Sequence, residues 1–159
     1  MKKRFFIPLL LSLTLQAALL QCQQLTVQPE AGKQTVLSRA DIEALPHSKI
    51  TTSAPDSPVT FDVVTVKSVL ERAGVTFEKL SGKRLASCLL VEAADGYRVV
   101  IALHELDPAF TDKQIFLAFL KNGKPLDEKE GPYRVVIPDE KRMARWVRQV
   151  TTFKIVDVN

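Results

Sequence analysis

The sequence predicts an α+β fold in which a single domain of mixed β-sheet carries short helices on one side. Three observations lead to this prediction. The second half of the chain alternates short apolar runs with turn residues, as strands do. One segment of the first half, 65–74, has the spacing and the end signals of a complete helix. The length of 159 residues fits one domain, whose core needs neither a disulfide nor a structural metal.

The N-terminal segment predicts export. Lys2, Lys3 and Arg4 give a positive start, an apolar run extends to Leu20, and the chain then becomes polar. This is the three-part pattern of a secretory signal peptide. We therefore expect residues 1–22 to be a signal peptide and the mature protein to be periplasmic or otherwise extracytoplasmic.

The end of this segment leaves its processing open. Leu19 to Cys22 resembles a lipoprotein box, although Gln21 stands where such a box usually has a small residue. A lipid anchor at Cys22 and an uncleaved membrane anchor are the alternatives to simple cleavage. Pro8 and several polar residues interrupt the apolar run, which makes it a poor permanent membrane span.

The basic charge and the cysteine pair both depend on the same segment. The whole chain has 22 Lys and Arg against 18 Asp and Glu, and a net charge of +4. Removal of residues 1–22 deletes three cations and no acid, which leaves a net charge of +1 and one cysteine, Cys88. We therefore expect no nucleic-acid partner and no internal disulfide.

The first elements of the mature chain are short. Residues 23–34 are polar and predict a loose lead-in to a domain that spans 35–159. Ser38 and Asp41 have the spacing of a capping box at the start of a short helix, which Pro46 ends.

A strand is expected at 49–52 and a loop at 54–58. The next helix has Thr65 as its N-cap and Gly74 just beyond its end. Its apolar residues at i, i+3, i+4 and i+7 are Val66, Val69, Leu70 and Ala73.

The remaining chain predicts strands. They are expected at 85–92, 97–103, 115–120, 133–137 and 151–158. Asp95-Gly96 and Asn122-Gly123 are turn pairs typical of β-hairpins, and residues 104–108 predict a short helical turn or loop.

Few residues outside the C-terminal region carry obvious chemistry. Cys88 lies among apolar strand residues without a cation or a helix start beside it, so packing as a small hydrophobic residue is the favoured interpretation. His47 and His104 lack partners at metal-ligand spacing, which predicts no metal site. The sequence has no phosphate-binding glycine loop, nucleophile elbow or H-E-x-x-H motif, and therefore gives little support for a hydrolase.

The most unusual segment, 141–148, gathers four cations around Trp146, the only tryptophan. On a helix, Trp146 would lie on an apolar face, and Arg142 and Arg145 would be neighbours at i, i+3. The planar guanidinium group suits phosphate or carboxylate. From the spacing alone, a solvated basic face with its tryptophan in the core is the favoured interpretation.

A pattern of six segments changes that interpretation. The segments are an L-x-x-L-P-like helix at 37–46, a loose Y/F-x-G-V-x-L-x-x-L-L match at 61–70, D-G-Y at 95–97, N-G-x-P-L at 122–126, G-P-x-R-x-x-x-P at 131–138 and R-x-x-R-W at 142–146. In this order they resemble the molybdopterin-binding domain of the sulfite oxidase family, and most closely its small exported members, called molybdopterin-dependent oxidoreductases. The resemblance covers about Val36 to Val156 and is most specific from Asp95 to Trp146.

The resemblance implies a sulfite-oxidase-like molybdopterin-binding fold for residues 35–159. It also implies that Arg142 and Arg145 bind the phosphate of a molybdopterin cofactor, with Arg134 in support. A membrane redox partner or another envelope protein would then be expected.

One departure from the family pattern concerns the metal. Enzymes of the family hold molybdenum through a cysteine between the first helix and the second one. The corresponding stretch, 49–58, contains no cysteine, and Cys88 comes later in the chain. Two functions therefore stay open, and with them the question whether the chain is an enzyme. One is an exported oxidoreductase-like protein that binds a pterin cofactor; the other is a cofactor-free periplasmic binding or scaffold module that recognises a small anion or a protein partner.

Overall fold

The computed structural model describes residues 23–53, 58–78 and 80–157. The predictions for residues 1–22, with Cys22, and for positions 54–57 lie outside these ranges. The elements, in chain order, are β1 (Leu25–Gln28), β2 (Thr35–Leu37), α2 (Arg39–Glu43), β3 (His47–Ser53), β4 (Pro58–Thr65), α3 (Val66–Arg72), η1 (Gly82–Ala86), β5 (Cys88–Ala93), β6 (Arg98–Ala102), η2 (Leu103–Leu106), β7 (Phe116–Lys121), β8 (Lys124–Pro125), β9 (Arg134–Val136), η3 (Met143–Arg145) and β10 (Val150–Val156), where η marks a 3₁₀ helix.

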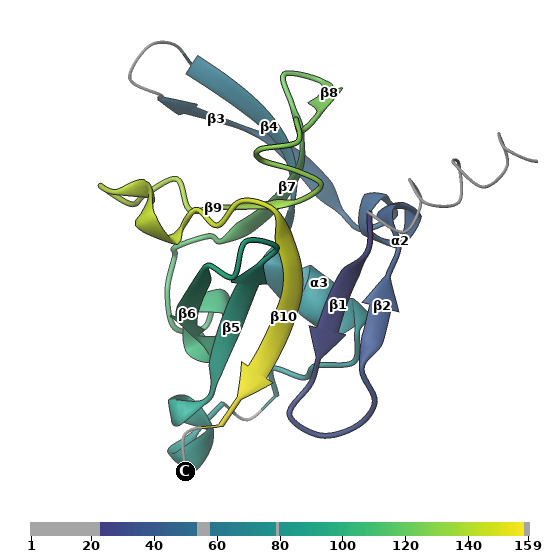
Figure 1. Ribbon diagram of the computed structural model, residues 1–159. Coiled ribbons are helices and arrows are strands. Elements are labelled where there is room, and N and C mark those ends of the chain that lie inside the picture. Colours follow the sequence, from purple (N-terminus) through teal and green to yellow (C-terminus); the bar gives the residue numbers. More distant parts are fainter. Residues whose placement is uncertain (1–22, 54–57, 79, 158–159) are drawn as a thin grey trace, which may run out of the picture.

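The first sheet has the strand order β2-β1-β10-β5-β6. β1 and β10 run parallel, with Thr26 opposite Thr152, whereas the other neighbours are antiparallel, so the sheet is mixed as predicted. Side chains along β5 alternate between half-buried and buried positions. One face of the sheet therefore packs on the core and the other faces outward. This sheet forms the lower part of the molecule in Figure 1, with α3 behind it.

The second sheet has the order β3-β4-β7-β8, and β9 also pairs with β7. All of its pairs are antiparallel. The first four residues of β7, Phe116 to Phe119, are all buried, because this central strand is covered on both faces. The β3–β4 hairpin extends away from the body of the molecule at the top of Figure 1.

One hydrophobic cluster lies between the two sheets and α3. Its fully covered members include Leu25, Val27, Val63, Val69, Leu70, Leu89, Val91, Ile101, Leu117 and Phe153. These residues come from β1, β4, α3, β5, β6, β7 and β10, so both sheets share a single core.

The two short α-helices begin where the sequence predicts. The Ser38 hydroxyl accepts from the Asp41 backbone N–H at 3.2 Å, and the Asp41 carboxylate accepts from the Ser38 N–H at 3.0 Å, which is the expected capping box. The Thr65 hydroxyl accepts from the Ser68 N–H at 3.1 Å at the start of α3. Gly74 follows α3 with φ of +90°, a left-handed conformation that suits glycine.

Most predicted strands are confirmed within a few residues of their expected ends, and two expectations need correction. Residues 23–34 are not a loose lead-in, because they contain β1, which pairs with β10 and buries Leu25 and Val27. The strand expected from Leu85 begins only at Cys88, because η1 occupies the preceding residues. No helix in the described ranges is long and apolar enough to cross a membrane.

Candidate functional site

The basic segment around Trp146 is a loop and not the helix that its spacing allowed. A single turn of 3₁₀ helix, η3, precedes Trp146, and Val150 already belongs to β10. The Val135 N–H of β9 donates to the Val147 carbonyl at 2.8 Å. Contacts with the neighbouring strand thus replace the hydrogen bonds of a helix, so Arg142 and Arg145 are not neighbours on a helical face.

Trp146 is the buried centre of this region and is 6% exposed, as its interpretation as a core residue requires. Its indole N–H donates to the Ile137 carbonyl at 3.0 Å. The Tyr97 hydroxyl donates to the Ala144 carbonyl at 2.8 Å and so connects η3 to the turn that precedes β6. The polar atoms of both aromatic side chains therefore have hydrogen-bond partners within the protein.

Arg134 lies against Trp146 on β9. Its guanidinium carbon is 5.5 Å from the Trp146 ring centroid and 5.8 Å from that of Phe61. Its Nη1 donates to the Glu130 carboxylate at 2.8 Å, and Lys121 reaches the same carboxylate at 3.1 Å. The Arg134 side chain is 12% exposed, and its buried Nε has no partner among the described residues. Its charge is therefore largely compensated within the protein.

Arg145 lies between two carboxylates. Its Nε donates to Glu140 at 2.6 Å, and its Nη1 is 3.4 Å from Glu105. Burial lowers the pKa of the guanidinium, but the hydrogen bond to Glu140 and the charge of Glu105 outweigh burial and raise the pKa above its ordinary value. Arg145 is thus permanently charged and already paired.

Arg142 differs from the other two arginines. It is exposed at the start of η3, and within the described part of the chain it makes no hydrogen bond or ion pair. The structure therefore brings Arg134 and Arg145 to the site in paired form and leaves Arg142 facing solvent.

A hollow of about 230 Å³ opens beside Trp146. Its lining residues are Asp95, Tyr97, Met143, Ala144, Trp146, Val147 and Arg148. A second hollow of about 430 Å³ shares Asp95 and Arg148 with it. Asp95, Tyr97 and Arg148 were not among the predicted site residues, because nothing in the sequence links a hairpin turn near residue 96 to a cation near residue 148.

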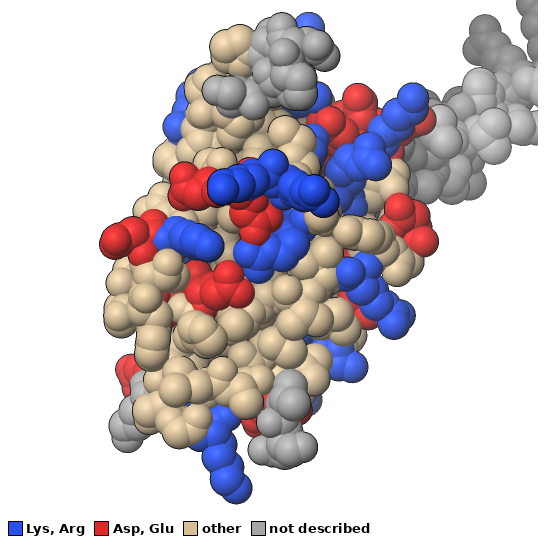
Figure 2. Space-filling model, turned by 90° about the vertical axis from the view of Figure 1, so that its left-hand side faces the viewer, with Lys and Arg blue, Asp and Glu red and all other residues tan. Residues whose placement is uncertain are grey.

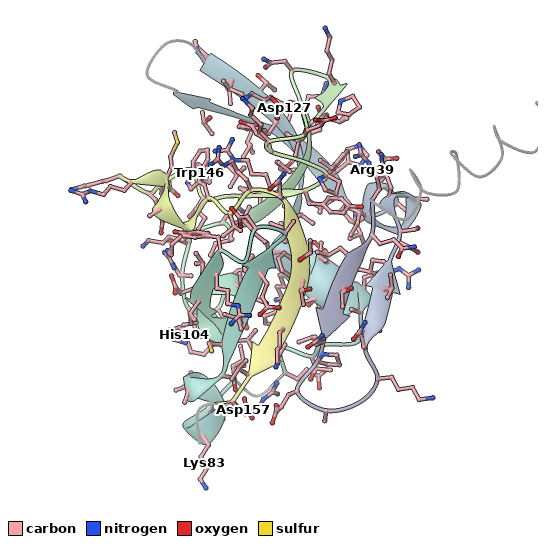
Figure 3. The ribbon with its side chains drawn as sticks, in the orientation of Figure 1. Arg39, Lys83, His104, Asp127, Trp146 and Asp157 are labelled. Atoms are coloured by element: carbon pink, nitrogen blue, oxygen red, sulfur yellow. The ribbon has the colours of Figure 1, made fainter. Side chains whose placement is uncertain are left out.

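The charges of this region have mixed signs. Figure 2 shows the side of the molecule that carries β6 and η3, with Lys and Arg side chains lying among Asp and Glu side chains across its middle. In Figure 3, Trp146 lies beside β9, far from Arg39 near α2 and from His104 and Asp157 in the lower part of the molecule. The region around Trp146 is therefore polar and nearly balanced, and not a strongly positive surface.

The other candidate residues lie elsewhere in the fold. Cys88 is half-buried at the start of β5, and burial first, then the charge of Asp157, raises the pKa of its thiol, which favours the protonated packing role. His47 is exposed, whereas His104 is half-buried beside Phe110. The described residues contain no group of three His, Cys, Asp or Glu side chains that could hold a metal.

Comparisons with known protein families, sequences and structures show what this chain is similar to. A family model for the oxidoreductase molybdopterin binding domain matches residues 51–158. No curated protein sequence matches the chain. Among solved structures, the sulfane dehydrogenase SoxCD from Paracoccus pantotrophus is similar with a TM-score of 0.66 at 20% identity, over 86% of this chain and 38% of that chain.

These findings confirm the predicted fold and the family resemblance. The similarity to SoxCD shows a shared fold, and this chain spans well under half of that chain's length. The family model matches most of the chain, from the end of β3 through β10. The chain therefore belongs to the oxidoreductase molybdopterin-binding domain family, whose fold is that of sulfite oxidase.

Proposed function

We propose that this chain is an exported member of its family that works as a cofactor-free binding module and recognises a ligand with a carboxylate or phosphate group. The observation that carries the proposal is the state of the predicted phosphate-binding arginines. Arg134 and Arg145 are held by Glu130, Glu140 and Glu105. A cofactor phosphate would have to compete with three carboxylates for them, and would add negative charge to a site that already contains it.

The residues present do not fit a molybdenum centre of the family's kind. The stretch between α2 and α3 contains no cysteine, so no thiolate is available where the family enzymes place their metal ligand. Cys88 starts β5 in the other sheet, and its thiol has a raised pKa. These features support a role without molybdenum chemistry.

Exposed cations support recognition of an anion at the same region. Arg142 and Arg148 are exposed on either side of Trp146 in the sequence. Neither makes an ion pair or a side-chain hydrogen bond to any residue that the structure describes. An anion bound there would gain charge-assisted hydrogen bonds without breaking existing ones.

The second candidate is a pterin-binding redox protein with a membrane redox partner. Membership of the family favours it, and the free guanidinium of Arg142 is available to a pterin phosphate. The cofactor, when bound, would supply the electron-transfer chemistry. In this case Arg145 would have to exchange Glu140 and Glu105 for the phosphate.

Analysis of the protein purified from its own host separates the two candidates. We expect elemental analysis to find molybdenum far below one atom per chain, and the denatured protein to release no fluorescent pterin. Stoichiometric molybdenum or pterin would overturn the proposal in favour of the second candidate.

Anion binding is tested separately with inorganic phosphate as the probe. We expect phosphate to raise the melting temperature of the wild-type protein, and the double variant Arg142→Gln/Arg148→Gln to lose this response. Arg98→Gln, which removes an exposed arginine on β6, is the matched control and should respond like wild type. A double variant that responds like wild type would show that the anion binds elsewhere.

A further inference from the structure

The hollow beside Trp146 combines an apolar wall with two charges of opposite sign. Tyr97, Met143 and Trp146 supply the apolar surface, and Tyr97 and Met143 are among the most exposed large apolar side chains of the described residues. Asp95 and Arg148 line the same hollow and also the adjoining one. An exposed apolar surface of this kind, with charged groups beside it, is typical of a ligand site.

The two charged side chains are not used by the protein itself. One oxygen of the Asp95 carboxylate accepts from the Tyr97 N–H at 2.9 Å, which leaves its other oxygen free. Arg148 is exposed. Neither side chain takes part in an ion pair within residues 23–53, 58–78 and 80–157, even with the other. Arg134 and Arg145 are paired with carboxylates, whereas Asp95 and Arg148 stay available to a ligand.

The backbone around Arg148 is held in place by the residue that follows it. Gln149 has φ of +50°, a conformation that non-glycine residues rarely adopt. Its N–H donates to the Glu130 carbonyl at 2.9 Å, its carbonyl accepts from the Ala94 N–H at 2.9 Å, and its side-chain amide donates to the Glu128 carbonyl at 2.6 Å. These bonds fix the chain that carries Arg148 next to the turn that carries Asp95.

We infer that this hollow binds a free α-amino acid with an aromatic or large apolar side chain. Arg148 takes the carboxylate, the free oxygen of Asp95 takes the ammonium group, and the side chain lies on Tyr97, Met143 and Trp146. A volume of about 230 Å³ is below that of a site for a drug-sized ligand, which fits a single amino acid. The inference rests on the proposed function, since it specifies the ligand of the binding module, and it assigns the site to Arg148 and Asp95 in place of Arg134 and Arg145.

The test uses four probes on the full mature chain: L-phenylalanine, 3-phenylpropionate, 2-phenylethylamine and inorganic phosphate. The first three share a phenyl ring and differ in whether they carry both charges, the carboxylate alone or the ammonium alone. Trp146 is the only tryptophan and lines the hollow, so its fluorescence reports binding. We expect L-phenylalanine to bind at least about tenfold more tightly than either single-charge analogue, because each loses one charge-assisted contact.

Two variants test which protein side chain binds which charged group of the ligand. Arg148→Gln should bind L-phenylalanine no better than 2-phenylethylamine. Asp95→Asn, which keeps the oxygen that accepts from Tyr97 N–H, should bind L-phenylalanine no better than 3-phenylpropionate. Arg98→Gln is the control and should keep the wild-type order. Thermal unfolding of each variant verifies that it is folded.

The outcomes separate this inference from the proposed function. If phosphate binds and L-phenylalanine does not, or if the three phenyl compounds bind equally well, the amino-acid site is wrong and the anion-binding module stands. If neither phosphate nor L-phenylalanine binds, the amino-acid site and the anion-binding module are both wrong. Stoichiometric molybdenum in the native protein would overturn the proposed function alone, provided that L-phenylalanine still shows the expected order of affinities.

Discussion

Arg134 is a charged residue whose side chain is largely covered and lies against core residues. Its guanidinium lies between Phe61 and Trp146 and pairs with Glu130, with little access to solvent. A charge in such a position is stable because its hydrogen bond is charge-assisted and its flat faces contact aromatic rings. The side chain therefore positions Trp146, whatever ligand the neighbouring hollow takes.

Replacement of Arg134 should reveal this structural role. We expect Arg134→Met to lower the free energy of unfolding by about 2 to 3 kcal/mol, because Glu130 loses a partner in a covered site. The emission maximum of Trp146 should shift as well. Urea unfolding and fluorescence measure both effects. Arg98→Met, which removes an exposed ion pair with Glu92, should change stability by less than about 1 kcal/mol; equal effects would mean that Arg134 is not structural.

The carboxyl groups of Glu30 and Asp157, which lie away from the Trp146 region, are expected to make the stability of the protein depend on pH. Their mutual hydrogen bond is the main cause of both shifts: it raises the pKa of Glu30 above its ordinary value of 4.5 and lowers that of Asp157 below 3.8. Asp157 also accepts from the hydroxyl of Ser87. As the pH falls from neutral, the folded state takes up a proton on Glu30 before the unfolded state does, so the contribution of Glu30 to stability increases.

Glu30→Gln should remove this gain on acidification. Melting temperatures measured from neutral pH down to about 4.5 should fall more steeply for the variant than for wild type. Glu78→Gln replaces another exposed glutamate and should follow the wild-type profile. Parallel profiles for wild type and Glu30→Gln would show that the two carboxyl groups do not share a proton.

At the scale of elements, the end of α3 offers a test of backbone conformation alone. Gly74 has φ of +90°, and a Cβ added there would meet no atom within 4 Å. Gly74→Ala should therefore destabilise the protein by about 1 to 2 kcal/mol, purely through the left-handed backbone. Gly74→Asn should cost less, since asparagine tolerates this conformation better. Thermal unfolding compares them, and equal losses would point to a steric cause instead.

The individual elements also differ in how well the sequence predicts them. The caps at Ser38 and Thr65, the turn at Gly96 and the hairpin with Asn122 at φ +51° all depend on residues close in sequence, and all are found. The loop around Trp146 was harder to predict, because its backbone pairs with β9 and has no local signal. For the same reason, neither segment alone predicts that Asp95 and Arg148 line the same hollow.

At the scale of the whole molecule, the N-terminal strand is a structural member of the first sheet. Leu25 is fully covered on β1, whereas Val36 on the adjacent β2 is 48% exposed. Leu25→Ala should lower the free energy of unfolding by about 2 to 4 kcal/mol through lost burial and a cavity. Val36→Ala should change it by less than about 0.5 kcal/mol. A small effect of Leu25→Ala in urea unfolding would mean that β1 contributes little to the stability of the fold.

The parallel pairing of β1 with β10 also sets the order in which the molecule can be completed. Thr26 pairs with Thr152, which is synthesised much later than Thr26. β1 has β2 as its other neighbour, a strand of three residues, and so short a hairpin is barely stable by itself. The first sheet therefore closes only after the last strand has left the ribosome, and a nascent chain that stalls before residue 150 leaves an apolar N-terminal strand without its main partner. Folding dominated by such distant contacts is slow, so the closure of the first sheet is expected to be a slow step of folding.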